Sequence, residues 1–285
     1  MLTINNSKIL IIGLGQIGLS DAEYLSLKGI MADGWDTDEK AVQQAIDRGV
    51  ISKKAKSFTG YDNYLICIPT HNPDNIVEPS LDELFKIVEK LSREGKTGAL
   101  IGIESTVMKG TSNKVKEILR HRLHVAYFPK RHYGHEKEKD GVRQIRVLGG
   151  CEPCCLNAGL HFYGDMLDIP IHPVSSVEYA ELSKIIENSY RFVEIAFAEE
   201  IKIVCDEYGL DFEELRRAIN SRWNVRLPEV QEGIGGNCLP KDSQMYLDLS
   251  NSFLGNSIID SAKKIDFQYR LHLWHKTTLK NVEPK

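Results

Sequence analysis

Short apolar runs alternate with amphipathic stretches over the first half of the chain. Runs rich in β-branched and other apolar residues predict strands at residues 8–12, 31–36, 64–68, 99–104 and 124–128. Helix-forming stretches follow the first strand and recur at residues 37–48, 80–93 and 111–121. Strands that alternate with helices form parallel βαβ units. We therefore expect residues 1–174 to be an α/β Rossmann domain with a doubly wound parallel sheet.

The pattern changes near residue 175. From Ser176 to Tyr208 the chain has neither proline nor glycine, and apolar residues recur on most sides of a helix. At 1.5 Å per residue this helix would be about 50 Å long. A long helix that is apolar nearly all round must be covered on several sides. We expect residues 175–285 to form an all-α dimerisation domain, with helix 176–208 pairing with its copy in a homodimer.

Composition narrows the function classes. The chain has 285 residues, a formal net charge of −4 and no long basic block, which disfavours nucleic acid as a partner. Six irregularly spaced cysteines argue against a disulfide framework and for a reducing compartment. Glycines interrupt the apolar N-terminal run, so we expect neither a signal peptide nor a membrane span, and a cytoplasmic location.

A glycine-rich turn joins the first predicted strand to the first helix and fits the pattern G-x-G-x-x-G. The turn comprises Gly13, Gly15, Gln16, Ile17 and Gly18. Such a turn lets a pyrophosphate approach the backbone at a helix N-terminus. Asp36 ends the next strand, where a carboxylate binds the ribose 2′-hydroxyl, and no arginine lies beside it. We predict NAD as the cofactor; FAD, or a glycine turn that binds nothing, remains the alternative.

One cysteine, Cys238, lies in the glycine-rich stretch Gly-Ile-Gly-Gly-Asn-Cys-Leu-Pro-Lys-Asp, residues 233–242. The glycines leave the backbone bare, so a substrate can come close. On the long helix, Lys184 and Asn188 are spaced i, i+4 and share one face. Alone, this pair is typical of a solvated lysine with a locally bonded asparagine. Its combination with the Cys238 stretch, about fifty residues later, indicates a site.

Together, Lys-Ile-Ile-Glu-Asn at 184–188 and the Cys238 stretch resemble the nucleotide-sugar 6-dehydrogenases, the UDP-glucose, UDP-N-acetylmannosamine and GDP-mannose dehydrogenase family. The resemblance extends from about residue 8 to 248. It implies an NAD-dependent oxidoreductase that oxidises a primary alcohol of a sugar, most naturally a sugar nucleotide. A thiolate at Cys238 would form a thiohemiacetal with the aldehyde and then a thioester, which is hydrolysed.

The resemblance also implies roles for single residues. Lys184 and Asn188 would bind substrate and hold the developing oxyanion. Asp242 and Thr106 would position a proton acceptor and the hydrolytic water. Further implied contacts to cofactor or substrate are Thr70, Thr106, Arg222, Gly235 and Gly236. In this family the arginine matching Arg222 reaches into the neighbouring subunit's site.

Two features depart from the family pattern. Lys130 stands where the family has a glutamate that serves thioester hydrolysis, and Glu136 or Glu138 are the candidates to replace it. The second nucleotide-binding domain is missing, so we expect a short form. A basic group is interpreted either as a phosphate or carboxylate site or as a solvated face. It comprises Lys130, Arg131, His132, Arg143 and Arg146.

The stretch Cys151-Glu-Pro-Cys154-Cys155 contains Cys-x-x-Cys, half of many zinc sites. No second pair follows at ligand spacing, so we expect no metal and interpret the motif as a strand-to-helix turn with buried thiols. Two other functions stay open. One is a simple two-electron dehydrogenase of the β-hydroxyacid type, which would not need Cys238. The other is a non-catalytic NAD-binding partner subunit.

Overall fold

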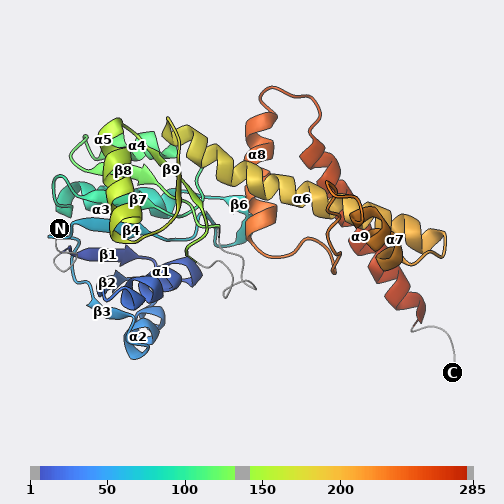
Figure 1. The fold of residues 1–285 in the computed structure, drawn as a ribbon, viewed down its shortest axis with the longest axis horizontal. Helices are drawn as coiled ribbons and strands as arrows, with labels where there is room; N and C mark the ends of the chain where they lie inside the picture. Colours follow the sequence, from blue (N-terminus) through green and yellow to red (C-terminus); the bar gives the residue numbers. More distant parts are fainter. Residues whose placement is uncertain (1–6, 132–141, 281–285) are drawn as a thin grey trace. The chain divides into compact units, whose positions relative to one another are not determined.

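The computed structural model describes residues 7–131 and 142–280 and consists of two compact units (Figure 1). Unit 1 contains residues 1–70 and 80–184, and unit 2 contains residues 71–79 and 185–285. The border falls inside one long helix, α6 (Val177–Glu207), ten residues beyond the border we expected at 174. Helix α6 therefore contributes residues to both units.

Unit 1 is built on an eight-stranded sheet with the order β10-β9-β8-β7-β4-β1-β2-β3. Its strands are β1 (Ile9–Ile12), β2 (Ala32–Trp35), β3 (Ile51–Lys54), β4 (Asn63–Ile66), β7 (Leu100–Ile103), β8 (His124–Tyr127), β9 (Arg146–Gly150) and β10 (Ile171–Pro173). Among the described strands of this sheet, β8 and β9 pair in antiparallel fashion and all other neighbours are parallel. The strand order reverses between β1 and β4, and such switch points are where α/β sheets bind ligands.

Helices cover both faces of this sheet (Figure 1). One face packs on α1 (Gln16–Leu27), α2 (Glu39–Asp47) and the segment that runs through α5 (Pro153–Gly159) into a π-helix (Leu160–Met166). The other face packs on α3 (Asp82–Glu94), α4 (Thr111–Ile118) and the start of α6. Alternate residues of each strand enter the two cores, as Ile11 and Ile12 of β1 do. The predicted doubly wound fold is confirmed.

Unit 2 is helical, as predicted. It contains the rest of α6, α7 (Phe212–Asn220), α8 (Cys238–Ser250) and α9 (Ile258–Lys280), with a hairpin of β5 (His71–Asn72) and β6 (Asn75–Pro79). Strand β6 packs against α8. Small apolar cores around Phe192 and around Phe212 hold the helices together. In the described part of the chain, no helix has the length and apolar character needed to cross a membrane.

Several elements differ from the sequence expectation. Residues 238–242 begin helix α8, and residues 71–79 form the β5–β6 hairpin; neither element was predicted. Strands β3, β9 and β10 were not predicted. Strand β9 is short and pairs with β8, which lies about twenty residues earlier in the chain. A pattern read over neighbouring residues cannot indicate such a pairing. The five residues of β9 are all buried, so periodicity did not distinguish it either.

Candidate functional site

The glycine turn after β1 combines tight packing with one open side. A Cβ at Gly13, whose φ is +92°, would lie 2.6 Å from the carbonyl oxygen of Cys67. A Cβ at Gly18 would lie 1.8 Å from the carbonyl oxygen of Gly13. Both positions need glycine because β1, β4 and α1 approach too closely for a side chain. At Gly15, by contrast, a Cβ would meet no described atom within 4 Å, so the outer side of the turn is open.

The start of α1 and the end of β2 fit a dinucleotide at this turn. Helix α1 begins with no side-chain cap and no acidic residue in its first turn, so its positive end can receive an anion at Gln16 and Ile17. Asp36 accepts hydrogen bonds from the backbone N–H groups of Leu14, at 2.6 Å, and Asp38, at 2.8 Å. These bonds hold its carboxylate beside the turn, where a ribose hydroxyl would lie.

The loops after β4 and β7 are joined at the same edge of the sheet. The hydroxyl of Thr70 donates to the carbonyl oxygen of Thr106 at 2.7 Å. The hydroxyl of Ser105 donates to the carbonyl oxygen of Ile68, also at 2.7 Å. Since parallel strands end together, both predicted threonines lie at the edge that carries the glycine turn.

A buried ionic network, which the sequence analysis did not foresee, lies in unit 1. Lys130 is 4% exposed and forms an ion pair with Asp21 of α1, which is 5% exposed. Arg146 donates to Glu104 at 2.5 Å, and the hydroxyl of Tyr163 donates to the other oxygen of Glu104 at 3.0 Å. Burial raises the pKa of Glu104 more than the Arg146 charge lowers it. The network is therefore part of the core.

The interpretation of the basic group as one surface site is wrong. Lys130 and Arg146 point into the core and are engaged with carboxylates there. Arg143 pairs with Asp168 at 3.2 Å, and Arg131 donates to a backbone oxygen. Among the described residues these cations are thus spread over separate contacts. Three further residues of this stretch lie outside the described residues: His132, Glu136 and Glu138.

In unit 2, the helix that begins at Cys238 carries two of the predicted catalytic residues, Cys238 and Asp242. Cys238 is exposed, whereas Lys241 and Asp242 in the same helical turn are 6% and 1% exposed. The amide nitrogen of Asn188, from α6, donates to Asp242 Oδ2 at 2.5 Å. Lys241 Nζ lies 2.8 Å from Asp242 Oδ1. The fold thus joins Asn188, Lys241 and Asp242 at the turn that presents the thiol.

This arrangement orients the Asn188 amide. Asp242 is held between Asn188 and Lys241, so its carboxylate fixes one hydrogen of the amide group. An asparagine amide has two hydrogens, so one remains beyond the bond to Asp242. Lys184 lies one helical turn before Asn188 on α6 and is partly exposed. The pair therefore presents a charge and a hydrogen-bond donor from one side of the helix.

Helix α9 clamps the start of the glycine-rich loop. Gly233 has a φ of +101°, and a Cβ there would lie 2.5 Å from the guanidinium carbon of Arg270. Arg270 donates to the carbonyl oxygen of Ile234 at 2.8 Å, and Asp266 accepts from the Ile234 N–H at 2.7 Å. At Gly235 and Gly236 a Cβ would meet no described atom, so the space before Cys238 is open. The sequence indicated the glycines but not this clamp.

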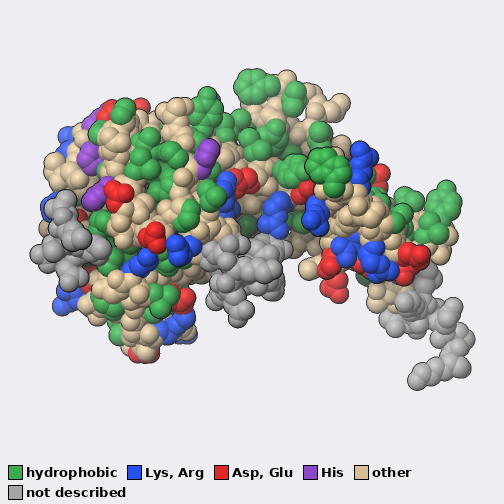
Figure 2. Space-filling view, viewed as in Figure 1, with side chains coloured by type: hydrophobic (Ala, Val, Ile, Leu, Met, Phe, Trp, Pro, Cys, Tyr) green, Lys and Arg blue, Asp and Glu red, His purple; other side chains and the backbone are tan. Residues whose placement is uncertain are grey.

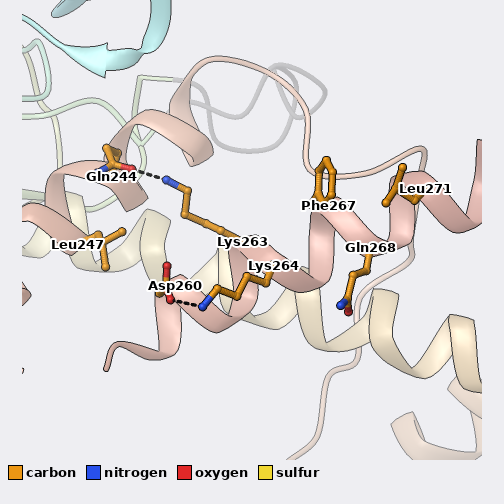
Figure 3. A pocket seen from close by; sticks show the side chains of 8 residues that line it. All are labelled: Gln244, Leu247, Asp260, Lys263, Lys264, Phe267, Gln268 and Leu271. Carbon is orange, nitrogen blue, oxygen red and sulfur yellow. Dashed lines mark hydrogen bonds and ion pairs between the residues drawn. The ribbon is translucent and has the colours of Figure 1, made fainter. Parts of the chain in front are cut away.

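Arg222 is not brought to this group of residues in the described chain. It is exposed after α7, and its Nε donates to Asn224 at 3.0 Å. The open groove between α8 and α9 is a separate feature that contains neither Cys238 nor Asp242 (Figure 3). Its lining residues are Gln244, Leu247, Asp260, Lys263, Lys264, Phe267, Gln268 and Leu271.

Comparisons with known proteins agree with the resemblance predicted from residues 184–188 and from the Cys238 stretch. Residues 178–267 match the central domain of the UDP-glucose/GDP-mannose dehydrogenase family. A UDP-N-acetyl-D-mannosamine dehydrogenase of Methanococcus maripaludis is 28% identical, over 97% of this chain and 73% of its own length. The structure of the UDP-D-ManNAc dehydrogenase of Pyrococcus horikoshii matches with a TM-score of 0.83 and 25% identity, covering 97% of this chain and 73% of that one.

Two further findings qualify this similarity. The chain spans between 62% and 73% of the length of the first curated relatives it matches. A 3-hydroxyisobutyrate dehydrogenase of Mycobacterium tuberculosis shares the fold over 92% of this chain and 93% of its own, with a TM-score of 0.70 and 14% identity. The predicted resemblance to the nucleotide-sugar dehydrogenases is confirmed, and the chain is shorter than those relatives.

Proposed function

Because this chain carries the central domain of the UDP-glucose/GDP-mannose dehydrogenase family, we propose that it oxidises a primary alcohol of a sugar nucleotide with NAD, through a covalent step on Cys238. The kinship places it among the oxidoreductases that act on CH–OH groups. One observation carries the covalent step: Lys241 and Asp242, at the start of the helix that begins at Cys238, form a buried network with Asn188 of α6.

The proposed chemistry removes two hydrides. NAD, held by the glycine turn with its ribose on Asp36, would supply the hydride acceptor. The first transfer yields an aldehyde, which has no hydride to give until a nucleophile adds. The Cys238 thiolate bonds to the aldehyde carbon, and the C=O electron pair moves to oxygen. Asn188 and Lys184 stabilise that oxyanion, and such donors typically contribute about 3 kcal/mol.

The second half of the reaction releases the acid. Loss of the second hydride leaves a thioester between Cys238 and the substrate. Water adds to the acyl carbon and releases its protons to solvent, the C–S bond breaks, and the product leaves as a carboxylate while the thiolate is restored. The family resemblance assigns the placement of that water to Thr106, whose carbonyl oxygen accepts a hydrogen bond from Thr70. Asp242 is 1% exposed and held by Asn188 and Lys241, so its proposed role is to orient Asn188.

A stripe of exposed apolar side chains supports the proposed homodimer. On α6 and at its end, these side chains recur at intervals of seven and four residues, which at 3.6 residues per turn keeps them on one side. They are Tyr179, Ile186, Tyr190, Phe197, Val204 and Tyr208. Figure 2 shows apolar side chains at the surface of the helical unit. A second copy of α6 would cover this stripe.

The experiment that tests the function is NADH stoichiometry. Purified protein is mixed with NAD and a panel of sugar nucleotides, beginning with UDP-N-acetyl-D-mannosamine, the substrate named for the relatives. We expect two NADH per substrate oxidised, with Cys238→Ala abolishing acid formation. Asn188→Ala should lower kcat by about a hundredfold. Acid formation that survives Cys238→Ala would contradict the covalent step.

A second candidate function is a simple two-electron dehydrogenase. The fold similarity to a 3-hydroxyisobutyrate dehydrogenase over nearly that chain's whole length favours it, at the level of the fold alone. In that case one NADH would form per substrate, and Cys238→Ala would leave turnover unchanged. NAD binding without NADH formation for any alcohol tested would instead indicate a non-catalytic partner subunit.

A further inference from the structure

A cluster of metal-ligand side chains lies on unit 1, away from the glycine turn. The donor atoms of His124, Cys154 and Cys155 all lie within 4.8 Å of one another. We propose that these three side chains bind a thiophilic divalent cation, Zn²⁺ being the best fit, with water as the fourth ligand. The function proposed above does not require this site.

The position of the cluster separates it from the proposed reaction. His124 is the first residue of β8, whereas the glycine turn follows the last residue of β1. Strands β1, β4, β7 and β8 are parallel, so the two sites lie at opposite edges of the sheet. An ion here would connect β8 to the start of α5 and stabilise unit 1 without touching the substrate.

The backbone around the cluster is held by close packing. Strand β9 pairs with β8 so that Gly150 lies opposite Ala126, and the N–H of Cys151 donates to the carbonyl oxygen of Val125 at 3.1 Å. A Cβ at Gly150 would lie 2.2 Å from the backbone nitrogen of Leu156 and 2.9 Å from the carbonyl carbon of Cys155. Glycine is required there because α5 starts directly against β9. This close approach delivers Cys155 to the side of β8.

The donor set suits zinc. A tetrahedral Zn²⁺ binds sulfur at about 2.3 Å and nitrogen at about 2.0 Å, which places its ligand atoms about 3.5–3.8 Å apart. Metal binding requires the donor atoms, which lie within 4.8 Å of one another, to adopt that spacing, and Cys154 and His124 are exposed and partly exposed. Two thiolates balance the 2+ charge, and two sulfurs with an imidazole favour Zn²⁺ over Mg²⁺ or Ca²⁺. The sequence lacked a second ligand pair, but the fold supplies His124 instead.

Another trio of donor atoms, Asp21, Cys67 and Glu104, is equally close but does not carry the same inference. Lys130 and Arg146 already neutralise its two carboxylates. A divalent cation at this trio would be repelled by the two buried cations and would have to displace them from the carboxylates. Near the cysteines of the proposed site, the described cation is Lys116. It pairs with Glu152, which is not one of the proposed ligands.

Cobalt binding tests the proposal directly. The full-length protein is freed of metal with a chelator under reducing conditions and titrated with Co²⁺, then with Zn²⁺ in competition. We expect one Co²⁺ per chain, with a thiolate-to-cobalt charge-transfer band and the strong visible bands of a tetrahedral ion. Zn²⁺ should bleach both and raise the melting temperature, because the ion binds the folded state alone.

Matched variants assign the ligands. His124→Ala and Cys154→Ser, both at accessible positions, should weaken Co²⁺ affinity at least about a hundredfold, since losing even an outer contact of a metal ligand typically costs about 10–100-fold. His161→Ala, an exposed imidazole paired with Asp165, and Cys151→Ser should retain the metal. Absence of the charge-transfer band in the unmodified protein, or equal affinity in all four variants, would overturn the proposal. Neither result bears on NADH formation.

Discussion

Glu199 on α6 offers the sharpest test of the energetics of unit 2. Its side chain is fully buried at 0% exposure, and neither carboxylate oxygen has a hydrogen-bond partner among the described residues. The titratable groups that face it come from α9: Asp266, Tyr269 and Arg270. Burial, reinforced by Asp266 and partly offset by Arg270, raises the pKa of Glu199 to about 8. The folded protein therefore holds this carboxyl protonated at neutral pH.

The raised pKa sets the sign and size of a pH effect. The ordinary pKa is 4.5, so between pH 4.5 and about 8 the folded state binds a proton that the unfolded state releases. The stabilisation from Glu199 is complete below pH 4.5 and is lost as the pH rises through that interval. The free energy of unfolding falls by up to about 1.4 kcal/mol per pH unit, at most about 5 kcal/mol in all.

Replacing Glu199 by glutamine keeps the shape of the side chain and removes the titration. We expect Glu199→Gln to cost about 1 kcal/mol at pH 5, because a buried amide still lacks partners. At pH 9 it should be more stable than the unmodified protein by about 2 kcal/mol or more. Urea unfolding followed by helical circular dichroism, from pH 5 to 9, measures both. The matched control is Glu200→Gln, its exposed neighbour, which should follow the unmodified protein.

The comparison can refute the reasoning. The measured quantity is the difference in the free energy of unfolding between Glu199→Gln and the unmodified protein. The contributions of all other titrating groups are the same in both proteins and cancel in this difference. If the two stability curves run parallel from pH 5 to 9, Glu199 does not titrate in this range, and the pKa inferred from its burial is wrong.

Three further outcomes follow from the structure. Lys130→Met leaves Asp21 as an unpaired buried charge and should destabilise unit 1 by about 3 kcal/mol. Adding Asp21→Asn in a double variant should restore part of this loss. Thermal unfolding measures the three variants, and additive effects of the two substitutions would contradict the ion pair. Gly15→Ala should weaken NAD binding at least about tenfold and leave the melting temperature unchanged. Gly18→Ala should lower the melting temperature, because its Cβ would clash with the carbonyl oxygen of Gly13. NAD titration and differential scanning calorimetry distinguish the two effects. Phe197→Glu should give a monomer in sedimentation velocity, because a charge would enter the apolar stripe of α6; a dimer that persists would place the interface elsewhere.

Much of unit 1 could be read from local patterns. Periodicity and short motifs, which involve only residues close together in the chain, predict the glycine turn, Asp36 and the order of strands and helices through residue 128. Helix α6 is recognisable for the same reason, since it lacks proline and glycine over its whole length. Cys238, Lys184 and Asn188 were likewise predicted from motif and spacing.

The remaining features depend on contacts between segments far apart in the chain. The sequence showed Lys130 and Arg146 as members of a basic surface, and only the folded structure buries them against Asp21 and Glu104. It showed three closely spaced cysteines without a further ligand, and only the pairing of β9 with β8 brings His124 to two of them, Cys154 and Cys155. Composition and periodicity register which residues are apolar and how often they recur. Which charge meets which, and which donor atoms converge, is decided by chain reversals and strand pairing that no local pattern encodes.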